Sequence, residues 1–257
     1  LYPKQRTIAI FLSYFDFIIK ANSETQIEAL KTLTILMDNE LIYKEVSLCK
    51  SFPNNFAKFI ENNDFKVQLS SLKICFSFCS NQITEKCFQP LLPQFFVLLK
   101  ETSYSAILSA YCISALLAAN DPVETLGDQG EQLKEFLSNV LVLESDLTEP
   151  AIRLVGVLSS SISGALLIDK WGIMKNVANL LESRNQNLVN LAIMAITAMS
   201  ATLPYSDSIC ELIPLLFTSC NKYANILFCI SNLTTDPRNA VKCMEYLPQL
   251  FNYLFIP

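Results

Sequence analysis

The residue types that carry most enzyme and metal chemistry are scarce in this chain. Among its 257 residues there is no histidine, which removes the commonest general base and the commonest metal ligand. Cys75 and Cys79 stand one helical turn apart and could suit a metal, but no second cysteine pair at ligand spacing accompanies them. Paired carboxylates remain possible in principle, without a catalytic constellation around them. We therefore predict that the protein is not an enzyme, with no catalytic residue, no cofactor and no metal.

One loop carries a pair of glycines, Gly127 and Gly130. A phosphate-binding loop would need a preceding strand or a following lysine and serine, and neither is present. We expect these glycines to relax a turn between two helices instead.

The nine cysteines are an odd number and fall mostly inside apolar stretches, as Cys75, Cys112 and Cys229 do. Buried reduced thiols are the interpretation we favour. They indicate a cytoplasmic protein, with the nucleus as an alternative, and we discount the glycosylation sequon at residues 232–234 for that reason.

The elements that position these residues are predicted to be helices. Hydrophobic residues make up 51% of the chain, glycines number five, and strand-like alternation is almost lacking. The prolines fall at helix boundaries, as in Phe52-Pro53 and Asp121-Pro122. Two apolar runs, residues 105–119 and 188–204, approach the length of a membrane span but lack unbroken apolarity, so we expect no span.

A helical pattern recurs along the chain at about forty residues, the period of α-helical solenoids. It is anchored on Ala192, and the residues one, four and seven positions further on lie on the same helical face. We predict one helix over residues 188–200, and also one over residues 11–19. The equivalent anchor positions are Ala29, Ser71, Ala110, Leu154, Ala192 and Ile226.

Residues 171–183 and 187–196 resemble one unit of an armadillo repeat. A small residue opens a turn, an apolar helix ends in Leu-Leu-Glu-Ser, and a longer helix carries Ala192. The predicted fold is all-α: a right-handed α-solenoid superhelix of about six to seven armadillo-like repeats. We expect a single domain over residues 1–257, and a fragment of a longer chain because the sequence enters in the middle of a unit.

The resemblance implies a groove lined by the third helix of each unit. In importin alpha, a tryptophan and an asparagine one turn later clamp an extended basic peptide there. In this chain only Phe228 with Asn232 approximates that pair, so the resemblance does not extend to binding of nuclear signals. The tryptophan column contains Lys31, Lys73, Cys112, Gly156, Met194 and Phe228, and the asparagine column contains Ile35, Ser77, Leu116, Ser160, Ala198 and Asn232.

These columns grade from cationic to apolar and could receive an acidic segment followed by an apolar one. The alternative is that the lysines are ordinary solvated groups and that Gly156 and Cys112 only permit tight curvature. The candidate partner-binding residues are Lys31, Lys73, Arg153, Met194, Asn225, Phe228 and Asn232.

Two further features have competing interpretations. Residues 121–149 contain eight acidic side chains against the single Lys134, which is either a solvated rim or a docking patch for a basic partner. Trp171 is either a plug between units or an exposed anchor. The net charge of −5 argues against binding of nucleic acid.

The predicted function is a scaffold or adaptor module that binds another protein through the groove. The alternative is a structural assembly subunit or a chaperone-type regulator that grips a folded partner. Oligomeric state is left open by the sequence.

Overall fold

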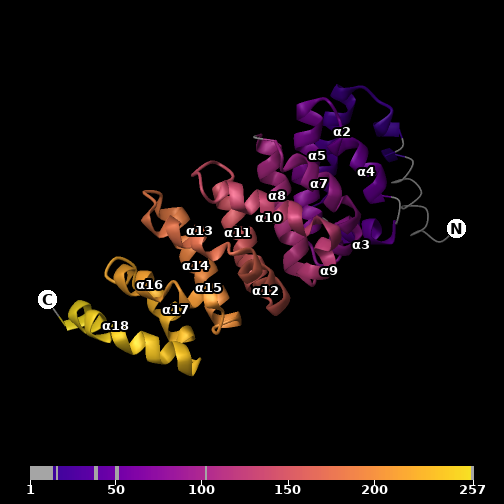
Figure 1. Ribbon diagram of the computed structural model, residues 1–257. Coiled ribbons are helices and arrows are strands. Elements are labelled where there is room, and N and C mark those ends of the chain that lie inside the picture. Colours follow the sequence, from indigo (N-terminus) through magenta and orange to yellow (C-terminus); the bar gives the residue numbers. More distant parts are fainter. Residues whose placement is uncertain (1–13, 16, 38–39, 50–51, 102, 256–257) are drawn as a thin grey trace. The chain divides into compact units, whose positions relative to one another are not determined.

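The computed structural model describes residues 14–15, 17–37, 40–49, 52–101 and 103–255 (Figure 1). Every regular element in these ranges is a helix. The chain divides into two compact units with the boundary after Asn120. We refer to them as the N-terminal and the C-terminal unit.

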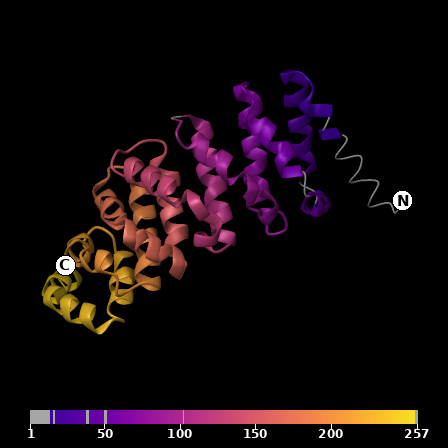
Figure 2. The same cartoon turned by 45° about the vertical axis from the view of Figure 1, so that its right-hand side comes forward.

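The N-terminal unit is built around three long helices, α2, α5 and α8. They pack side by side in chain order, as both views show in indigo to magenta (Figures 1 and 2). The shorter α4 and α7 pack against α5 and α8 respectively. The elements of the unit are α2 (Ser23–Leu36), α3 (Glu40–Leu48), α4 (Phe52–Ile60), α5 (Phe65–Cys79), α6 (Glu85–Phe88), the 3₁₀ helix η1 (Gln89–Leu91), α7 (Leu92–Leu98) and α8 (Tyr104–Ala119).

Polar side chains cap the N-termini of two of these long helices. Asn22 Oδ1 accepts a hydrogen bond from Thr25 N (2.9 Å) at the start of α2, and Asp64 Oδ1 accepts one from Lys66 N (2.9 Å) at the start of α5. Each cap satisfies an amide that has no partner within the helix. The hydrogen bond from the Lys66 amide is also the main reason that the pKa of Asp64 is lowered.

Phenylalanine rings fill the core of the N-terminal unit. The rings of Phe78 and Phe88 stack with centroids 4.7 Å apart, and Phe15 meets Phe52 edge to face at 4.6 Å. Such pairs add to the free energy gained by burial alone. The fully buried rings of this cluster are Phe15, Phe52, Phe56, Phe59, Phe78 and Phe88.

The C-terminal unit repeats the same arrangement, with α11, α14 and α17 packed in order. Its interior consists mainly of leucine, isoleucine, valine and alanine. The elements are α9 (Pro122–Leu126), η2 (Gly127–Gln129), α10 (Gly130–Val140), α11 (Thr148–Ser159), α12 (Ile162–Trp171), α13 (Met174–Asn179), η3 (Leu180–Glu182), α14 (Gln186–Thr202), α15 (Asp207–Cys210), α16 (Ile213–Ser219), α17 (Ile226–Leu233) and α18 (Pro237–Phe255).

Glycines turn the chain and let it approach itself closely in the C-terminal unit. Gly172 ends α12 in the left-handed region (φ 67°), and Gly127 follows α9 with φ 46°. The turn predicted at Gly127 is thus confirmed. Gly164 is buried near the start of α12, where a Cβ atom would collide with the carbonyl oxygen of Leu158.

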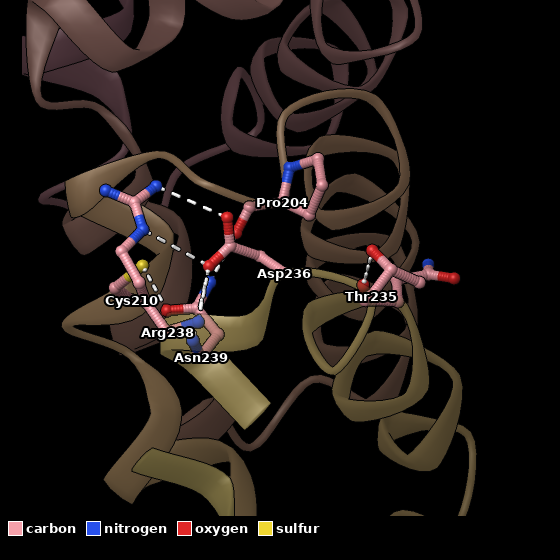
Figure 3. Close-up of polar contacts among 7 residues, drawn as sticks. Pro204, Cys210, Thr235, Asp236, Arg238 and Asn239 are labelled. Carbon is pink, nitrogen blue, oxygen red and sulfur yellow. Dashed lines mark hydrogen bonds and ion pairs between the residues drawn. The ribbon is translucent and has the colours of Figure 1, made fainter. Parts of the chain in front are cut away.

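Polar contacts within the C-terminal unit attach the start of α18 to α15 and to the turn before it (Figure 3). The buried Asn239 donates from Nδ2 to Pro204 O (2.5 Å) and accepts from Cys210 Sγ (2.8 Å) at Oδ1. Asp236 caps the helix and pairs with Arg238 (3.3 Å), whose hydrogen bond lowers the pKa of the carboxyl group. Asn239 therefore satisfies its own amide by bridging the α14–α15 turn and α15.

The predicted helical register is confirmed in the long helices, with one correction. Each predicted anchor residue lies in one of the six helices α2, α5, α8, α11, α14 and α17 and is buried. The helix predicted over residues 188–200 is α14. Of the helix predicted over residues 11–19, the positions described are 14–15 and 17–19, which are helical, and the others lie outside the described residues.

The correction concerns α8. Cys112, predicted to lie in the exposed tryptophan column, is fully buried, and its thiol approaches Leu72 O (3.9 Å). Cys229 approaches Ile193 O at the same distance in the C-terminal unit. This equivalence moves the anchor of α8 one residue back, to Ser109. Tyr111, which is half-buried, then takes the position of the tryptophan column, and its ring meets Phe76 with centroids 5.9 Å apart.

Candidate partner-binding groove

The exposed face of α14 carries the first half of the candidate site. Asn185 caps the start of the helix, where its Oδ1 accepts a hydrogen bond from Asn187 N (3.0 Å). Ala192 lies on the opposite, buried face of the helix. The outward positions are therefore Asn190, then Met194 one helical turn further on, then Thr197 and Ala198 after another turn. Met194 keeps 65% of its surface exposed.

The second half of the site comes from α17 and the residue before it. Asn225 precedes the helix and makes no capping hydrogen bond with its side chain. Phe228, one turn on, is 66% exposed. An open groove of about 700 Å³ lies between the two helices, lined by Asn190, Ile193, Met194, Thr197, Ala198, Asn225 and Phe228.

The floor of this groove is held by hydrogen bonds within the unit. Thr197 donates from Oγ1 to Ile193 O (2.7 Å), and its oxygen lies 2.9 Å from Cys229 Sγ. Asn232 donates from Nδ2 to Thr197 O (3.4 Å) and Ser200 Oγ (3.2 Å). Asn232 therefore joins α17 to α14 through its side-chain amide.

The groove is apolar and carries no charge on its lining residues. Its polar groups are the amides of Asn190 and Asn225 and the hydroxyl of Thr197. Asn190 Oδ1 accepts from Gln186 Nε2 (3.1 Å). Burial raises the pKa of the Cys229 thiol beneath the groove, so this thiol stays neutral. Such a surface can bury apolar side chains and hydrogen bond a peptide backbone.

The structure brings together only some of the residues predicted from sequence. Met194, Asn225 and Phe228 line the groove, and Asn232 braces it. Arg153 is exposed on α11, where its guanidinium pairs with Glu149 Oε1 (2.9 Å). The role of all seven predicted residues in partner binding stays a prediction.

Lys31 and Lys73 belong to the N-terminal unit, on the neighbouring helices α2 and α5, and both are exposed. Lys31 pairs with Glu28 (2.7 Å) on its own helix. Part of its charge is therefore compensated before any acidic segment arrives.

Asn190, Ile193 and Thr197 are groove residues that the sequence analysis missed. They lie within one helical turn of Met194, so the helical period contained the signal. The groove itself depends on how α14 and α17 pack, and the helical period does not report that packing.

The two features with competing interpretations also have positions. Trp171 is half-buried, and its ring lies beside Gly130 at the start of α10, so it packs within the unit. In the acidic stretch, Asp121 caps α9 and accepts from Ser163 Oγ (2.7 Å), which lowers its pKa. Lys134 pairs with Glu131 (3.3 Å). These internal roles favour a solvated rim.

Two other kinds of site are missing from the part of the chain that the structure describes. No group of three or more His, Cys, Asp or Glu side chains that could hold a metal ion occurs there. None of the described helices is long and apolar enough to cross a membrane.

The packing of α2, α5 and α8, and of α11, α14 and α17, is that of an α-helical repeat protein. No protein-family model and no curated protein sequence matches the chain. Among solved structures, an engineered protein from a structural genomics consortium matches with a TM-score of 0.73 and 15% identity, over 87% of this chain and 96% of that one.

Two designed armadillo repeat proteins among the matches identify the type of repeat. One has a TM-score of 0.68 and 17% identity, over 80% of this chain and 92% of that one. Another, solved in complex with a (KR)4 peptide, has a TM-score of 0.64 and 14% identity, over 90% and 95% of the two chains. The predicted fold class, an all-α solenoid of armadillo-like repeats, is confirmed. The number of repeats and the single domain stay predictions.

Proposed function

We propose that this chain is a protein-interaction module that binds an extended segment of another protein in the groove between α14 and α17. The observation that carries the proposal is the pairing of two large exposed apolar side chains, Met194 and Phe228, across a groove of about 700 Å³. Exposed aromatic residues in a recess are typical anchors of protein interfaces.

The chemistry of the groove specifies the segment. Apolar side chains of the partner bury against Met194 and Phe228, and the amides of Asn190 and Asn225 hydrogen bond its backbone. The designed repeat protein with the (KR)4 peptide supports peptide binding by this fold. The neutral lining found here favours an uncharged apolar segment over a basic one, because nothing in it compensates a cation.

A peptide selection tests this proposal. Random peptides displayed on phage are selected on the chain, and the affinity of the best sequences is measured by fluorescence polarisation. We expect apolar, weakly charged sequences that bind more tightly than a (KR)4 peptide. Selection of basic peptides alone would contradict the proposed specificity.

Variants locate the site. Phe228→Ala should raise the Kd of a selected peptide about tenfold, close to 1.4 kcal/mol, and Met194→Ala somewhat less. Leu143→Ala, which removes an equally exposed apolar side chain outside the groove, is the matched control and should leave Kd unchanged. If all three variants bind alike, the groove is not the binding site.

A further inference from the structure

A second exposed surface lies on the N-terminal unit, across the three helices α2, α5 and α8. These helices pack side by side in chain order, so residues at equivalent outward positions form rows that cross all three. Counted from the buried anchors Ala29, Ser71 and Ser109, the outward positions come two residues further on and again five to six residues further on. The surface therefore consists of two rows that lie about one helical turn apart.

The first row begins with two cations. Lys31 on α2 and Lys73 on α5 occupy equivalent positions, and both are exposed. Lys73 makes no ion pair within the described part of the chain. Lys31 pairs with Glu28, but both side chains are exposed, and such surface pairs contribute little to stability. A carboxylate from a partner can therefore approach both lysines at small cost.

The second row is apolar. Ile35 on α2 is 72% exposed, and Phe76 on α5 is 39% exposed. The Phe76 ring meets the ring of the half-buried Tyr111, the first-row residue of α8, so apolar surface continues from α5 to α8. Exposed apolar side chains that gather in this way are typical of a binding surface.

A hollow of about 660 Å³ extends this apolar row between the ends of α5 and α8. Ser80 and Ala115 belong to its lining, one helical turn beyond Phe76 and Tyr111 respectively. The single charged side chain of the lining is Glu85 on α6, which repels a second carboxylate. Acidic groups of a ligand are therefore directed toward the lysines, and its apolar groups toward the hollow.

The two rows specify the pattern of a ligand. In an extended segment, successive side chains point to opposite edges of the backbone. A segment that crosses α2, α5 and α8 between the rows thus presents alternate side chains to the lysines and to the apolar row. We propose that this surface binds an extended segment of a partner protein in which acidic and apolar residues alternate.

In this arrangement the carboxylates of the segment pair with Lys31 and Lys73, and its apolar side chains bury against Ile35, Phe76 and the hollow. The ligand differs from the uncharged segment proposed for the groove between α14 and α17. A nucleic acid fits the surface less well, because two cations neutralise few phosphates.

Three labelled peptides of equal length test the ligand chemistry by fluorescence polarisation at low salt. The first alternates aspartate and leucine, the second has the same residues in two blocks, and the third replaces each aspartate of the first by asparagine. We expect the alternating acidic peptide to bind at least tenfold more tightly than the other two. Equal binding of the block peptide or of the asparagine peptide would overturn the proposal, as would tighter binding of a single-stranded oligouridine.

Exposed residues of each row can be changed without disturbing the core. Lys73→Gln removes a cation and Ile35→Ser removes an apolar contact, so each should weaken binding of the alternating peptide at least fivefold and leave the melting temperature nearly constant. Lys58→Gln and Leu48→Ser, at exposed side chains of the same unit outside the two rows, are the matched controls. Wild-type affinity in the combined Lys73→Gln, Ile35→Ser variant would exclude this surface.

Amide NMR shifts locate the bound peptide. The alternating peptide should shift the signals of Lys73, Phe76 and Tyr111, and shifts confined to the C-terminal unit would contradict the proposal. Because the two rows share no residue with the groove between α14 and α17, failure of this test leaves the function proposed for the groove untouched, and the reverse also holds.

Discussion

The two compact units build similar helical packing from different side chains. The N-terminal unit closes its core with phenylalanine rings, among them the stacked pair Phe78 and Phe88. The C-terminal unit uses aliphatic residues and close backbone approach, as at the buried Gly164. Large rings fill wide spaces between helices, and small residues allow helices to come nearer. The same helical packing can thus be stabilised by large buried rings in one unit and by close backbone approach in the other.

The surfaces of the two units differ in a parallel way. The exposed carboxylates of Glu61 and Glu101 border a cavity of about 520 Å³ where α4, α5 and α7 of the N-terminal unit meet, whereas Met194 and Phe228 line the groove of the C-terminal unit. A partner segment would meet a different chemistry on each unit. Substitutions that act on one unit alone can test this contrast.

Removal of a core ring should have the largest effect on stability. Phe52→Ala deletes a fully buried ring that contacts Phe15, Phe78 and Phe88, and we expect a loss of about 3–5 kcal/mol in the free energy of unfolding. Urea denaturation followed by circular dichroism measures it. Phe65→Ala, at a half-exposed ring of the same unit, should cost less than about 1 kcal/mol; equal losses would show that the rings do not dominate this core.

The next largest effect should come from blocking close approach in the C-terminal unit. Gly164→Ala places a methyl group against the Leu158 carbonyl, so α12 must shift. We expect a loss of about 1–3 kcal/mol, as for other overpacked sites. A melting temperature equal to that of the wild type would mean that α12 moves without cost, and that proximity is unimportant there.

Alkaline pH should weaken the N-terminal unit through its buried thiols. Burial raises the pKa of Cys75 and of Cys112 well above the ordinary value of 9.0. The folded chain then keeps protons that the unfolded chain releases, so stability is complete below pH 9 and falls as pH rises beyond it. The slope is about 1.4 kcal/mol per pH unit for each such thiol.

Denaturation curves between pH 8 and 10.5 measure this slope. Cys75→Ala should make it shallower by roughly one thiol, because the variant has one proton fewer to retain. An unchanged slope would assign the alkaline loss to lysines or tyrosines instead. Rapid labelling of Cys75 or Cys229 in the native protein at neutral pH would contradict their burial directly.

A smaller change, a gain in stability, is expected from a substitution at Gly156. A Cβ atom on Gly156, inside α11, would meet no atom within 4 Å. Gly156→Ala should therefore stabilise the protein by about 0.5–1 kcal/mol, since alanine loses less backbone entropy in a helix. Together with Gly164→Ala it forms a matched pair of opposite sign, and thermal melts of both variants distinguish helix propensity from packing.

The smallest effect on folding should follow charge reversal in the N-terminal unit. Lys31→Glu with Lys73→Glu changes exposed side chains, so the melting temperature should stay nearly constant. If an acidic partner segment bridges these lysines, its binding should weaken by about 1–3 kcal/mol at low salt. Wild-type affinity of such a segment in the double variant would exclude this end as its site.

Some features of this protein followed from the sequence because they depend on local helical geometry. The period of the apolar residues placed the buried anchors of α2, α5, α11, α14 and α17 correctly, and it placed Met194 and Phe228 on exposed faces. It failed by one residue in α8, where Ser109, Ala110, Cys112 and Ile113 are all buried. A helix covered on most of its circumference gives no clear contrast between faces, so its register is ambiguous.

Other features were decided only by contacts between residues far apart in the chain. The amide of Asn232 joins α17 to α14 through Thr197 and Ser200, a contact that the helical period does not report. Periodicity reports which face of a helix is apolar. The hydrogen bonds and cavities that define a binding site arise from how the neighbouring helices pack.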